Sequence, residues 1–458
     1  MHIRKTAIVI LTYNNIAYNK ACLESIREHT EVGSYEIVVV DNNSSDGTRE
    51  WLMEQHDVKL QLNDYNAGFP KGCNQGIALA CEDSDILLLN NDTIVMPRWL
   101  ENMSNCLYSA DDIGAVGAVC NHNENLQGVD FSYGDPGQMM ALAEENNVSD
   151  SSRWEQKLFL IGYCLLIKRE VLDKIGPLDE AFSPGYIEDN DLCMRIVTAG
   201  YRLMLCHDCF IHHHLGTSFR ANMDALYPIL SANREKFRMK WGFGPFLFDD
   251  IKHTSIRVLD EADRQKPLRV LDYACGIGVT LLKIKYRYPN ALLFGWEPCA
   301  TMANIARRVA VVSTAPFDHF IAGMPDGSFD YILLGQYLET VENPEKFLSL
   351  LKSKLRDGGC VICAVQNIMH YSVIRDMLAG HWHYPTETVV NKNYKNLFTL
   401  SDLTDIFSRC GYKNQHTFHW YSAPSDVDWP LINQLCEAGE EKRSYIYTTY
   451  LFSVRFQK

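Results

Sequence analysis

Glu36-Ile-Val-Val-Val-Asp-Asn-Asn-Ser-Ser-Asp-Gly47 is the stretch that decides the fold of the first half of the chain. Its opening run, 36–40, is rich in β-branched residues, which is typical of a strand buried in a parallel sheet. The polar segment from Asp41 to Gly47 then predicts a loop before a helix. Similar apolar runs occupy 6–11 and 85–89, and a helical pattern covers about 17–29. Strands that alternate with helices predict a doubly wound α/β sheet.

Length and composition limit what the whole chain can be. Its 458 residues are too many for one ordinary core, so we expect two or three domains. A net charge of −14 argues against a nucleic-acid partner. No apolar run approaches the roughly 18 residues of a membrane helix, and the run 6–11 is too short for a signal peptide core. Fifteen scattered cysteines are typical of a reducing compartment, and a cytoplasmic protein is expected.

Polar residues follow each predicted strand, at the edge where ligands of doubly wound sheets bind. Asp92 follows the run 85–89, and an acid at the end of a buried central strand is a plausible metal ligand. Asp41 has a simpler alternative interpretation as a turn or helix-capping residue. Between these strands a glycine-bearing loop, 66–76, opens a helix. Its backbone N–H groups and Lys71 are suited to contact a phosphate.

The segment 183–195 crowds three acids, Glu188, Asp189 and Asp191, where a helical pattern begins. By composition alone, capping of free N–H groups at the helix start is the favoured interpretation. Asp191 also lies four residues before Arg195, the spacing of an ion pair on one helix face. Capping needs only one acid, however, and acids held where a helix begins are well placed to act as a general base.

A predicted strand at 201–206 follows, and then the run His212-His-His214. Neutral imidazole is a common metal ligand, and Asp92 supplies the partner that a metal site needs. Cys206-His-Asp-Cys209 nearby is a weak zinc candidate. Residues three apart on a strand face opposite sides, and no second cysteine pair has finger-like spacing.

Together these motifs resemble the family 2 glycosyltransferases, which have the GT-A fold, over roughly residues 5–240. The matching segments are Thr12-Tyr13-Asn14, Asp41 in its polar loop, the loop 66–76, Asn90-Asn91-Asp92, Glu188-Asp189 and the run 212–214. The resemblance implies inverting transfer of a sugar from a nucleotide-diphosphate donor to a glycan or lipid-linked acceptor. The donor contacts that it implies are Thr12, Tyr13, Asn14, Asp41, Asn66, Gly68, Lys71, Asn74 and Asn91.

The resemblance also assigns the chemistry. Asp92 and a histidine, His213 first and His214 next, would hold Mg²⁺ or Mn²⁺ on the diphosphate and so neutralise the leaving group's growing charge. Asp189, or else Glu188, would take the proton of the acceptor hydroxyl. Asn90 replaces the first acid of the family's metal motif, so a lower metal affinity is expected.

A basic helix is expected at 225–241. Its second half carries Arg234, Lys236, Arg238 and Lys240. A solvated helix face is the default interpretation of such a pattern. Contact with the inner face of a membrane is the alternative, since no transmembrane segment is predicted.

A second α/β pattern starts at Leu268. A strand at 269–272 leads into the turn Tyr273-Ala-Cys-Gly276-Ile-Gly278, and the next strand, 292–296, ends at Glu297. A glycine turn with an acid after the following strand is the pattern of a dinucleotide or adenosine-ribose site. The third glycine of the dinucleotide fingerprint would fall at Leu281, which favours S-adenosylmethionine over NAD.

This half resembles class I methyltransferases, which have a Rossmann-like fold, over roughly residues 266–458. The matching segments are 324–334, 337–340 and 355–359, and His381-Trp-His-Tyr384 and 396–399 are similar to members that act on sugars. The resemblance places Asp272, Gly276 and Gly278 near the methionine part of S-adenosylmethionine and Glu297 on the ribose hydroxyls. Thr340 stands where such members often have histidine, so an inactive domain is one alternative. An NAD-dependent oxidoreductase is a further alternative for this half.

The sequence therefore predicts three parts: a glycosyltransferase domain at 1–240, a linker at 241–265 and a methyltransferase-like domain at 266–458. Both domains are expected to be doubly wound. The expected setting is surface polysaccharide or glycolipid assembly. A nucleotide-sugar-binding or scaffold protein with an inactive methyltransferase-like domain is the alternative from another class.

Overall fold

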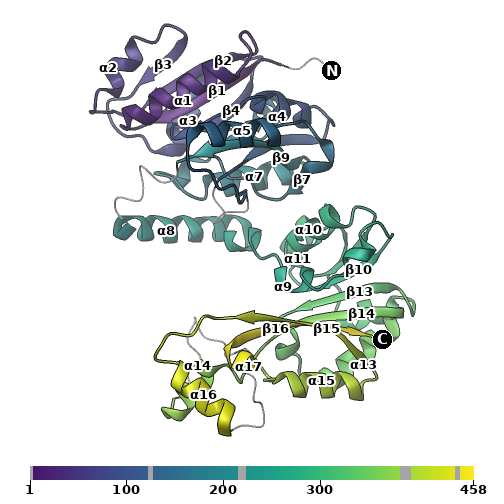
Figure 1. Ribbon diagram of the computed structural model, residues 1–458. Coiled ribbons are helices and arrows are strands. Elements are labelled where there is room, and N and C mark those ends of the chain that lie inside the picture. Colours follow the sequence, from purple (N-terminus) through teal and green to yellow (C-terminus); the bar gives the residue numbers. More distant parts are fainter. Residues whose placement is uncertain (1–3, 122–126, 215–222, 382–392, 439–443) are drawn as a thin grey trace. The chain divides into compact units, whose positions relative to one another are not determined.

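The computed structural model describes residues 4–121, 127–214, 223–381, 393–438 and 444–458. Residues 382–384 of the His381–Tyr384 motif therefore lie outside the described residues. The chain divides into two compact units, Met1–Asp249 and Asp250–Lys458, each built on its own sheet (Figure 1). The α/β fold class predicted from the sequence is confirmed for both units. Within the described ranges, no helix is long and apolar enough to cross a membrane.

Unit 1 is organised around a nine-stranded sheet in the order β3-β2-β1-β4-β8-β6-β9-β5, with β7 paired to β9. The strands from β3 to β4 run parallel, so their carboxyl ends share one edge. In register, Thr12 lies beside Asp41 and Leu11 beside Asn90. The strands are β1 Thr6–Thr12, β2 Tyr35–Asp41, β3 Val58–Leu62, β4 Asp85–Asn90, β5 Thr93–Ile94, β6 Ile113–Cys120, β7 Trp154–Lys157, β8 Cys164–Ile167 and β9 Arg202–His213.

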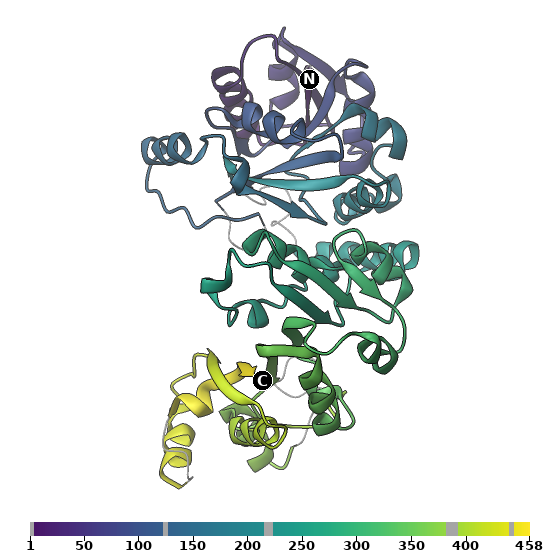
Figure 2. The same cartoon turned by 90° about the vertical axis from the view of Figure 1, so that its right-hand side faces the viewer.

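Helices cover both faces of this sheet (Figures 1 and 2). Side chains of α1 and α4 share one core with Ile8 and Ile10 of β1. On the other face α3 packs closely, because a Cβ on Gly72 would lie 2.3 Å from the Leu11 side chain. The helices are α1 Ile16–His29, α2 Thr48–Met53, α3 Phe69–Leu79, α4 Trp99–Leu107, α5 Pro136–Asn146, α6 Arg169–Ile175, α7 Glu188–Thr198 and α8 Met223–Trp241, with short 3₁₀ turns η1 Ser151–Arg153, η2 Glu180–Phe182 and η4 Pro245–Phe248.

Strand β9 is about twice as long as expected and takes in the Cys206–Cys209 pair and two of the three histidines. The expectation that the two cysteines face opposite sides is wrong. The pairing of β9 with β6 shifts register between Cys206 and Phe210, and both cysteines lie in the same core. The irregularity reverses the usual alternation of the strand.

Unit 2 holds a seven-stranded sheet in the order β12-β11-β10-β13-β14-β16-β15. Only β16 runs antiparallel to its neighbours β14 and β15. Alternate residues face two cores: Leu271 and Ile332 meet α12, α13 and α15, whereas Val270 and Leu333 meet α9, α10 and α11 (Figure 1). The strands are β10 Arg269–Tyr273, β11 Leu292–Trp296, β12 Val311–Ser313, β13 Phe329–Gly335, β14 Leu355–Gln366, β15 Lys413–Tyr421 and β16 Thr449–Gln457.

The helices of unit 2 begin before its first strand. They are α9 His253–Ile256, α10 Val279–Arg287, α11 Ala300–Ala306, α12 Phe317–Gly323, α13 Pro344–Lys354, α14 Tyr371–Leu378, α15 Leu400–Arg409, α16 Trp429–Ala438 and α17 Ser444–Thr448, with 3₁₀ turns η5 Glu261–Asp263 and η6 Leu338–Thr340. The stretch 241–265 is therefore folded rather than extended. Phe248 packs against Phe237 and Phe243 in unit 1, and Ile256 and Leu259 lie in a core of unit 2.

Candidate active sites

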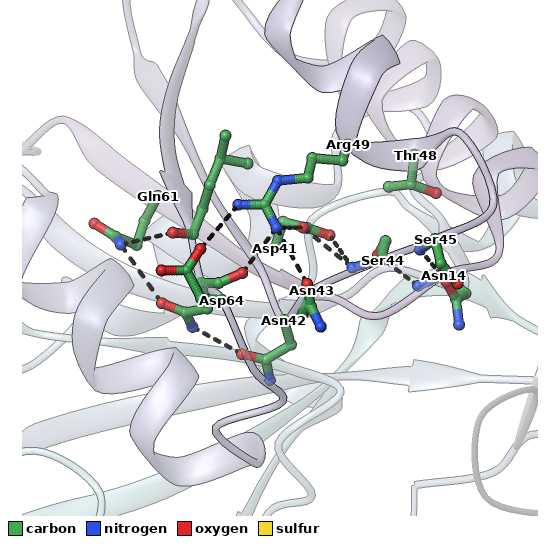
Figure 3. A network of polar contacts seen from close by, with 12 residues as sticks. Asn14, Asp41, Asn42, Asn43, Ser44, Ser45, Thr48, Arg49, Gln61 and Asp64 are labelled. Atoms are coloured by element: carbon green, nitrogen blue, oxygen red, sulfur yellow. Dashed lines mark hydrogen bonds and ion pairs between the residues drawn. The ribbon is translucent and has the colours of Figure 1, made fainter.

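The segment after β2 folds into a compact polar loop around Asp41 (Figure 3). The Asp41 carboxylate is fully buried and accepts a hydrogen bond from the Ser44 N–H, at 3.3 and 3.2 Å to its two oxygens. Arg49 Nη1 lies 3.7 Å from the same carboxylate. Asn14 closes the loop from β1, because its N–H donates to Ser44 Oγ at 2.6 Å and its Oδ1 accepts from the Ser45 N–H at 2.8 Å. Asp41 thus shapes the turn, and its contact with a nucleotide base stays a prediction.

An amide network joins the ends of β1 and β4. Asn19 Oδ1 accepts hydrogen bonds from Thr12 Oγ1 and from Asn91 Nδ2, both at 2.7 Å. Asn19 lies on α1 and is buried. Sequence reasoning missed it, although a polar residue on the buried face of a helix was a usable signal. Tyr13 keeps 43% of its surface exposed beside this network, where a ligand can reach its ring.

Asp92 and His213 meet across 121 residues of sequence, with Asp92 Oδ1 3.1 Å from His213 Nε2. Pairing of β5 with β9 brings them together, since Thr93 lies beside His213 in register. Two ligands on one divalent cation, each at about 2.1 Å and roughly at right angles, lie about 3 Å apart. The carboxylate and the imidazole therefore fit two adjacent positions of a metal's coordination shell.

The neighbouring histidines make other contacts. His212 Nδ1 lies 2.5 Å from the Tyr133 hydroxyl, and His212 Nε2 lies 3.2 Å from His214 Nδ1. Among the described residues no group of three or more His, Cys, Asp or Glu side chains is placed to hold a metal. Burial lowers the pKa of His213, but its hydrogen bonds and charge interactions with Asp92 and Cys120 together outweigh burial and raise this pKa to about 9.

Glu188 and Asp189 open α7 after two residues with left-handed backbone, Tyr186 (φ 69°) and Ile187 (φ 74°). Ile187, the residue before α7, makes no side-chain cap hydrogen bond. Asp189 accepts hydrogen bonds from the N–H groups of Asn190 at 2.8 Å and Gly162 at 3.3 Å. Because Asn190 lies in the first turn of α7, the capping interpretation is confirmed for this one N–H group. Residues with a Cβ adopt left-handed backbone at some cost, and such strain gathers at functional sites.

The two carboxyls have different environments. Burial raises the pKa of Asp189 to about 6. Burial and the neighbouring charge of Asp189 raise the pKa of Glu188 well above its usual range. Glu188 is 6% exposed, and its Oε2 has no hydrogen-bond partner in the part of the chain that is described. At neutral pH Asp189 is therefore ionised yet basic, while the buried Glu188 holds its proton more strongly than an ordinary glutamate.

The third acid of the cluster, Asp191, is structural. It is fully buried and accepts from Arg195 Nε at 2.8 Å, which confirms the predicted ion pair. Trp241 Nε1 and Lys240 Nζ, both from α8, donate to its other oxygen at 2.9 and 2.7 Å. The basic face of α8 is thus partly engaged with the protein, and the solvated interpretation is wrong for Lys240.

A buried amide on α8 holds the loop 182–187 that leads into Glu188, called the catalytic loop below because it precedes the candidate base. Asn233 Nδ2 donates to the carbonyl oxygens of Phe182 at 2.6 Å and Gly185 at 2.9 Å. Lys236 Nζ donates to the Ala181 carbonyl at 2.7 Å. These carbonyls belong to the segment directly before Glu188. Sequence reasoning missed Asn233, because nothing in the local pattern of α8 shows what lies 48 to 51 residues earlier.

The glycine-bearing loop 66–71 touches the catalytic loop directly. The Phe69 N–H donates to the Pro184 carbonyl at 2.7 Å, and a Cβ on Gly68 would lie 2.9 Å from Pro184 Cα. Asn66 Oδ1 accepts from the Gly68 N–H at 3.0 Å. Lys71 Nζ donates to the Tyr65 hydroxyl at 2.8 Å.

Asn74, a predicted donor contact, is engaged elsewhere. It lies within α3, and its side-chain amide both donates to the Leu178 carbonyl at 2.9 Å and accepts from the Leu178 N–H at 3.0 Å. A further bond of 3.0 Å reaches Glu180 Oε1. Asn74 therefore ties α3 to the segment before the catalytic loop, and a contact with the donor stays a prediction.

In unit 2 the predicted cofactor residues gather at the turn between β10 and α10. Glu297 is 4% exposed and accepts hydrogen bonds from the N–H groups of Gly276 and Cys299, both at 2.9 Å. Gly278 has φ 94°, and a Cβ there would lie 2.9 Å from Val309 Cγ2. Asp272 at the end of β10 is fully buried, and its Oδ2 has no hydrogen-bond partner among the residues described. An unsatisfied carboxylate oxygen beside a glycine turn suits a cationic ligand such as S-adenosylmethionine.

Comparison with known proteins gives two family matches. Residues 7–176 match the family model for glycosyl transferase family 2, and residues 246–417 match the model for a methyltransferase domain. The O-antigen biosynthesis protein RfbC of Myxococcus xanthus is 24% identical over 48% of this chain and 18% of its own length. The demethylmenaquinone methyltransferase of Thermus thermophilus is 32% identical over 23% of this chain and 50% of its own. The chain thus spans half or less of the length of these curated relatives.

Among solved structures, the mannosyltransferase PcManGT from Pyrobaculum calidifontis, in complex with GDP-Man and Mn²⁺, is similar at 20% identity and a TM-score of 0.39. That similarity covers 54% of this chain and 68% of the other. The first family match lies wholly in unit 1 and the second almost wholly in unit 2. The chain therefore joins a family 2 glycosyltransferase domain to a methyltransferase domain.

Proposed function

We propose that unit 1 is an inverting, metal-dependent glycosyltransferase that uses a nucleotide-diphosphate sugar and a glycan or lipid-linked acceptor. One line of contacts carries this proposal. The Tyr163 ring stacks on His213 with centroids 5.0 Å apart, and Gly162, the residue before it, donates to Asp189. Two consecutive residues thus connect the candidate metal pair to the candidate base.

The residues divide the chemistry between them. Asp92 and His213 would hold Mg²⁺ or Mn²⁺, which neutralises charge on the diphosphate as it leaves. Asp189 takes the proton of the acceptor hydroxyl while that oxygen attacks the anomeric carbon from the face opposite the diphosphate. The bond from this carbon to the diphosphate oxygen breaks in the same step, so the configuration inverts. Glu188, buried and with a raised pKa, is the alternative base.

We assign unit 2 a methyl transfer from S-adenosylmethionine to a sugar. The support is the unsatisfied Asp272 oxygen, the glycine turn and the buried Glu297. The relative named for O-antigen biosynthesis supports a setting in surface polysaccharide assembly. With this setting we propose a cytoplasmic location, with contact at the inner face of a membrane as the alternative.

Release of nucleoside diphosphate from a panel of uridine, guanosine and deoxythymidine diphosphate sugars, with and without Mn²⁺, tests unit 1. One base is expected to support metal-dependent turnover, and Asp92→Asn is expected to abolish it. Asp83→Asn is the matched control, because Asp83 is exposed. Binding of a nucleotide sugar without turnover in any metal would instead favour the scaffold function.

Transfer of labelled methyl groups from S-adenosylmethionine to the glycan made by unit 1 tests unit 2. Loss of labelling in Glu297→Gln, with sugar transfer retained, is the expected result. Unlabelled glycan in the wild-type protein, despite bound cofactor, would contradict sugar methylation.

A further inference from the structure

The side chain of Lys252 ends in a cage of oxygens at the turn after β10. Its Nζ donates to Asp272 Oδ1 at 2.5 Å, to the Tyr273 carbonyl at 2.6 Å and to the Ala274 carbonyl at 3.0 Å. An ammonium group has three N–H donors, so the cage uses all of them. The Lys252 side chain is 11% exposed. This is a built site for a primary ammonium group.

Lys252 does not belong to the turn that it fills. It precedes α9, twenty residues before Asp272, inside the stretch 241–265 predicted as a linker. Its stem crosses Gly335, where a Cβ would lie 3.0 Å from Lys252 Cδ and Cε. Its backbone N–H is held by Thr280 Oγ1 at 3.0 Å. The segment itself is anchored, because Ile256 and Leu259 lie in a core of unit 2. Only the Lys252 side chain enters the cage, so its ammonium can leave by rotation of that side chain while the turn keeps all its residues.

The cage carries more negative charge than one lysine balances. The pKa of Asp272 is raised to about 6, because burial and the charges of Asp250 and Glu297 raise it more than Lys252 lowers it. Asp272 Oδ2 also lacks a hydrogen-bond partner among the residues that the structure describes. Glu297 lies at the same turn, where it accepts a hydrogen bond from the Gly276 N–H. Without Lys252, the Asp272 and Glu297 carboxylates would leave this turn negatively charged, and such a site attracts a cationic ligand.

We propose that Lys252 occupies the subsite that takes the α-ammonium group of S-adenosylmethionine, and that the Lys252 side chain withdraws before the cofactor binds. This inference rests on the cofactor proposed for unit 2. The two ammonium groups have the same charge and the same three donors, so they exclude each other from one cage. Lys252 is then an internal competitor of the cofactor. If about a tenth of the molecules have Lys252 withdrawn, the apparent affinity is lowered about tenfold.

Calorimetric titration of the full chain with two ligands tests the competition. S-adenosylmethionine carries the ammonium group, whereas 5′-methylthioadenosine lacks the whole amino-acid part. Lys252→Met is expected to bind S-adenosylmethionine about tenfold more tightly and 5′-methylthioadenosine with unchanged affinity. Weaker or unchanged binding of S-adenosylmethionine by a folded Lys252→Met protein would overturn the proposal.

A measurement on the wild-type protein guards against a variant that fails to fold, since removing one partner of a buried ion pair is destabilising. Lysines are methylated with formaldehyde and cyanoborohydride and read by peptide mass spectrometry. Lys252 is expected to react several-fold faster when S-adenosylmethionine is bound, but not with 5′-methylthioadenosine. Lys346, which is exposed, is the control and should react equally throughout. Unchanged or slower labelling of Lys252 with the cofactor would contradict withdrawal.

The two ligands also separate this inference from the function on which it rests. If neither ligand binds the wild-type protein or Lys252→Met, unit 2 is not a cofactor domain, and both proposals fall. If both ligands bind and Lys252→Met changes neither affinity, the proposed function stands and only the competition is overturned.

Discussion

Each unit buries an aspartate at the end of a strand, Asp41 of β2 and Asp272 of β10, and both are fully buried. Asp41 finds its partners in its own loop: the Ser44 N–H at 3.2 Å and Arg49 at 3.7 Å. Asp272 is paired at 2.5 Å with Lys252, which comes from a separate segment. The first arrangement forms a loop that is complete before any ligand arrives. The second forms a site that is filled by the protein itself.

The largest effect should come from the candidate active site of unit 1. Asp189→Asn removes the proposed base and should lower kcat for sugar transfer about 1,000-fold, because a positioned base contributes roughly 10² to 10⁴ in rate. Nucleotide binding should be kept. Initial rates and a thermal-shift titration on the same samples measure both.

Asp173→Asn, an exposed acid on the neighbouring α6, is the matched control and should keep its rate. Nearly normal activity in Asp189→Asn would contradict the role of Asp189 and point to Glu188 as the base.

The next largest effect should be a difference in the free energy of unfolding between variants of Asp272 and Asp41. Asp272→Asn leaves the Lys252 ammonium buried without a carboxylate and should lower the free energy of unfolding by about 3 kcal/mol. Asp41→Asn keeps an oxygen for the Ser44 N–H and should lower it by only about 1 kcal/mol. Urea unfolding of the full chain, followed separately for each unit, gives both values. Equal losses would mean that the two pairings are equivalent.

A smaller effect should follow from loosening the loop before α7. Asn233→Ala removes the two bonds to the Phe182 and Gly185 carbonyls, and kcat should fall about tenfold because a displaced base loses its geometry. Ser231→Ala, exposed on the same helix, should leave kcat unchanged. Equal kcat values for the two variants in steady-state kinetics would contradict a role of Asn233 in positioning the base.

The smallest effect is one of pH. Because the pKa of Asp189 is raised to about 6, protonation removes the base as the pH falls below that value. Then kcat/KM for sugar transfer should fall about fivefold between pH 6 and 5, approach a tenfold fall per pH unit below pH 5 and stay level above pH 7. A profile that stays flat down to pH 5 would show that another group takes the proton.

The sequence predicted the candidate site best for polar residues that directly follow a buried strand. Apolar runs such as 36–40 and 85–89 predict buried strands. Because parallel strands end at the same edge of a sheet, Thr12 and Asp41 lie side by side. The pairing of Asp92 with His213 followed from the order of motifs. Strand β3 was not expected, because Lys59 and Gln61 interrupt its apolar run.

Other features were out of reach because their partners come from elsewhere in the fold. Nothing local to Asn233 or Lys252 shows which carbonyl oxygens they meet. The register shift in β9 likewise depends on β6, so the two cysteines could not be placed from spacing alone. Pattern fixes which face a residue takes within an element, but not which distant segment lies against that face.

The bonds from α8 to Asp191 also set where the first unit can be cut. Trp241 donates to this buried carboxylate at 2.9 Å, and Phe248 fills a core with Phe237 and Phe243. A fragment ending at residue 240 would lose these contacts with α7. A fragment ending at residue 176, where the family match ends, would lose α7 itself. A separately produced glycosyltransferase should therefore run through Asp249, and exchange of acceptor specificity between relatives should carry α7 and α8 across together.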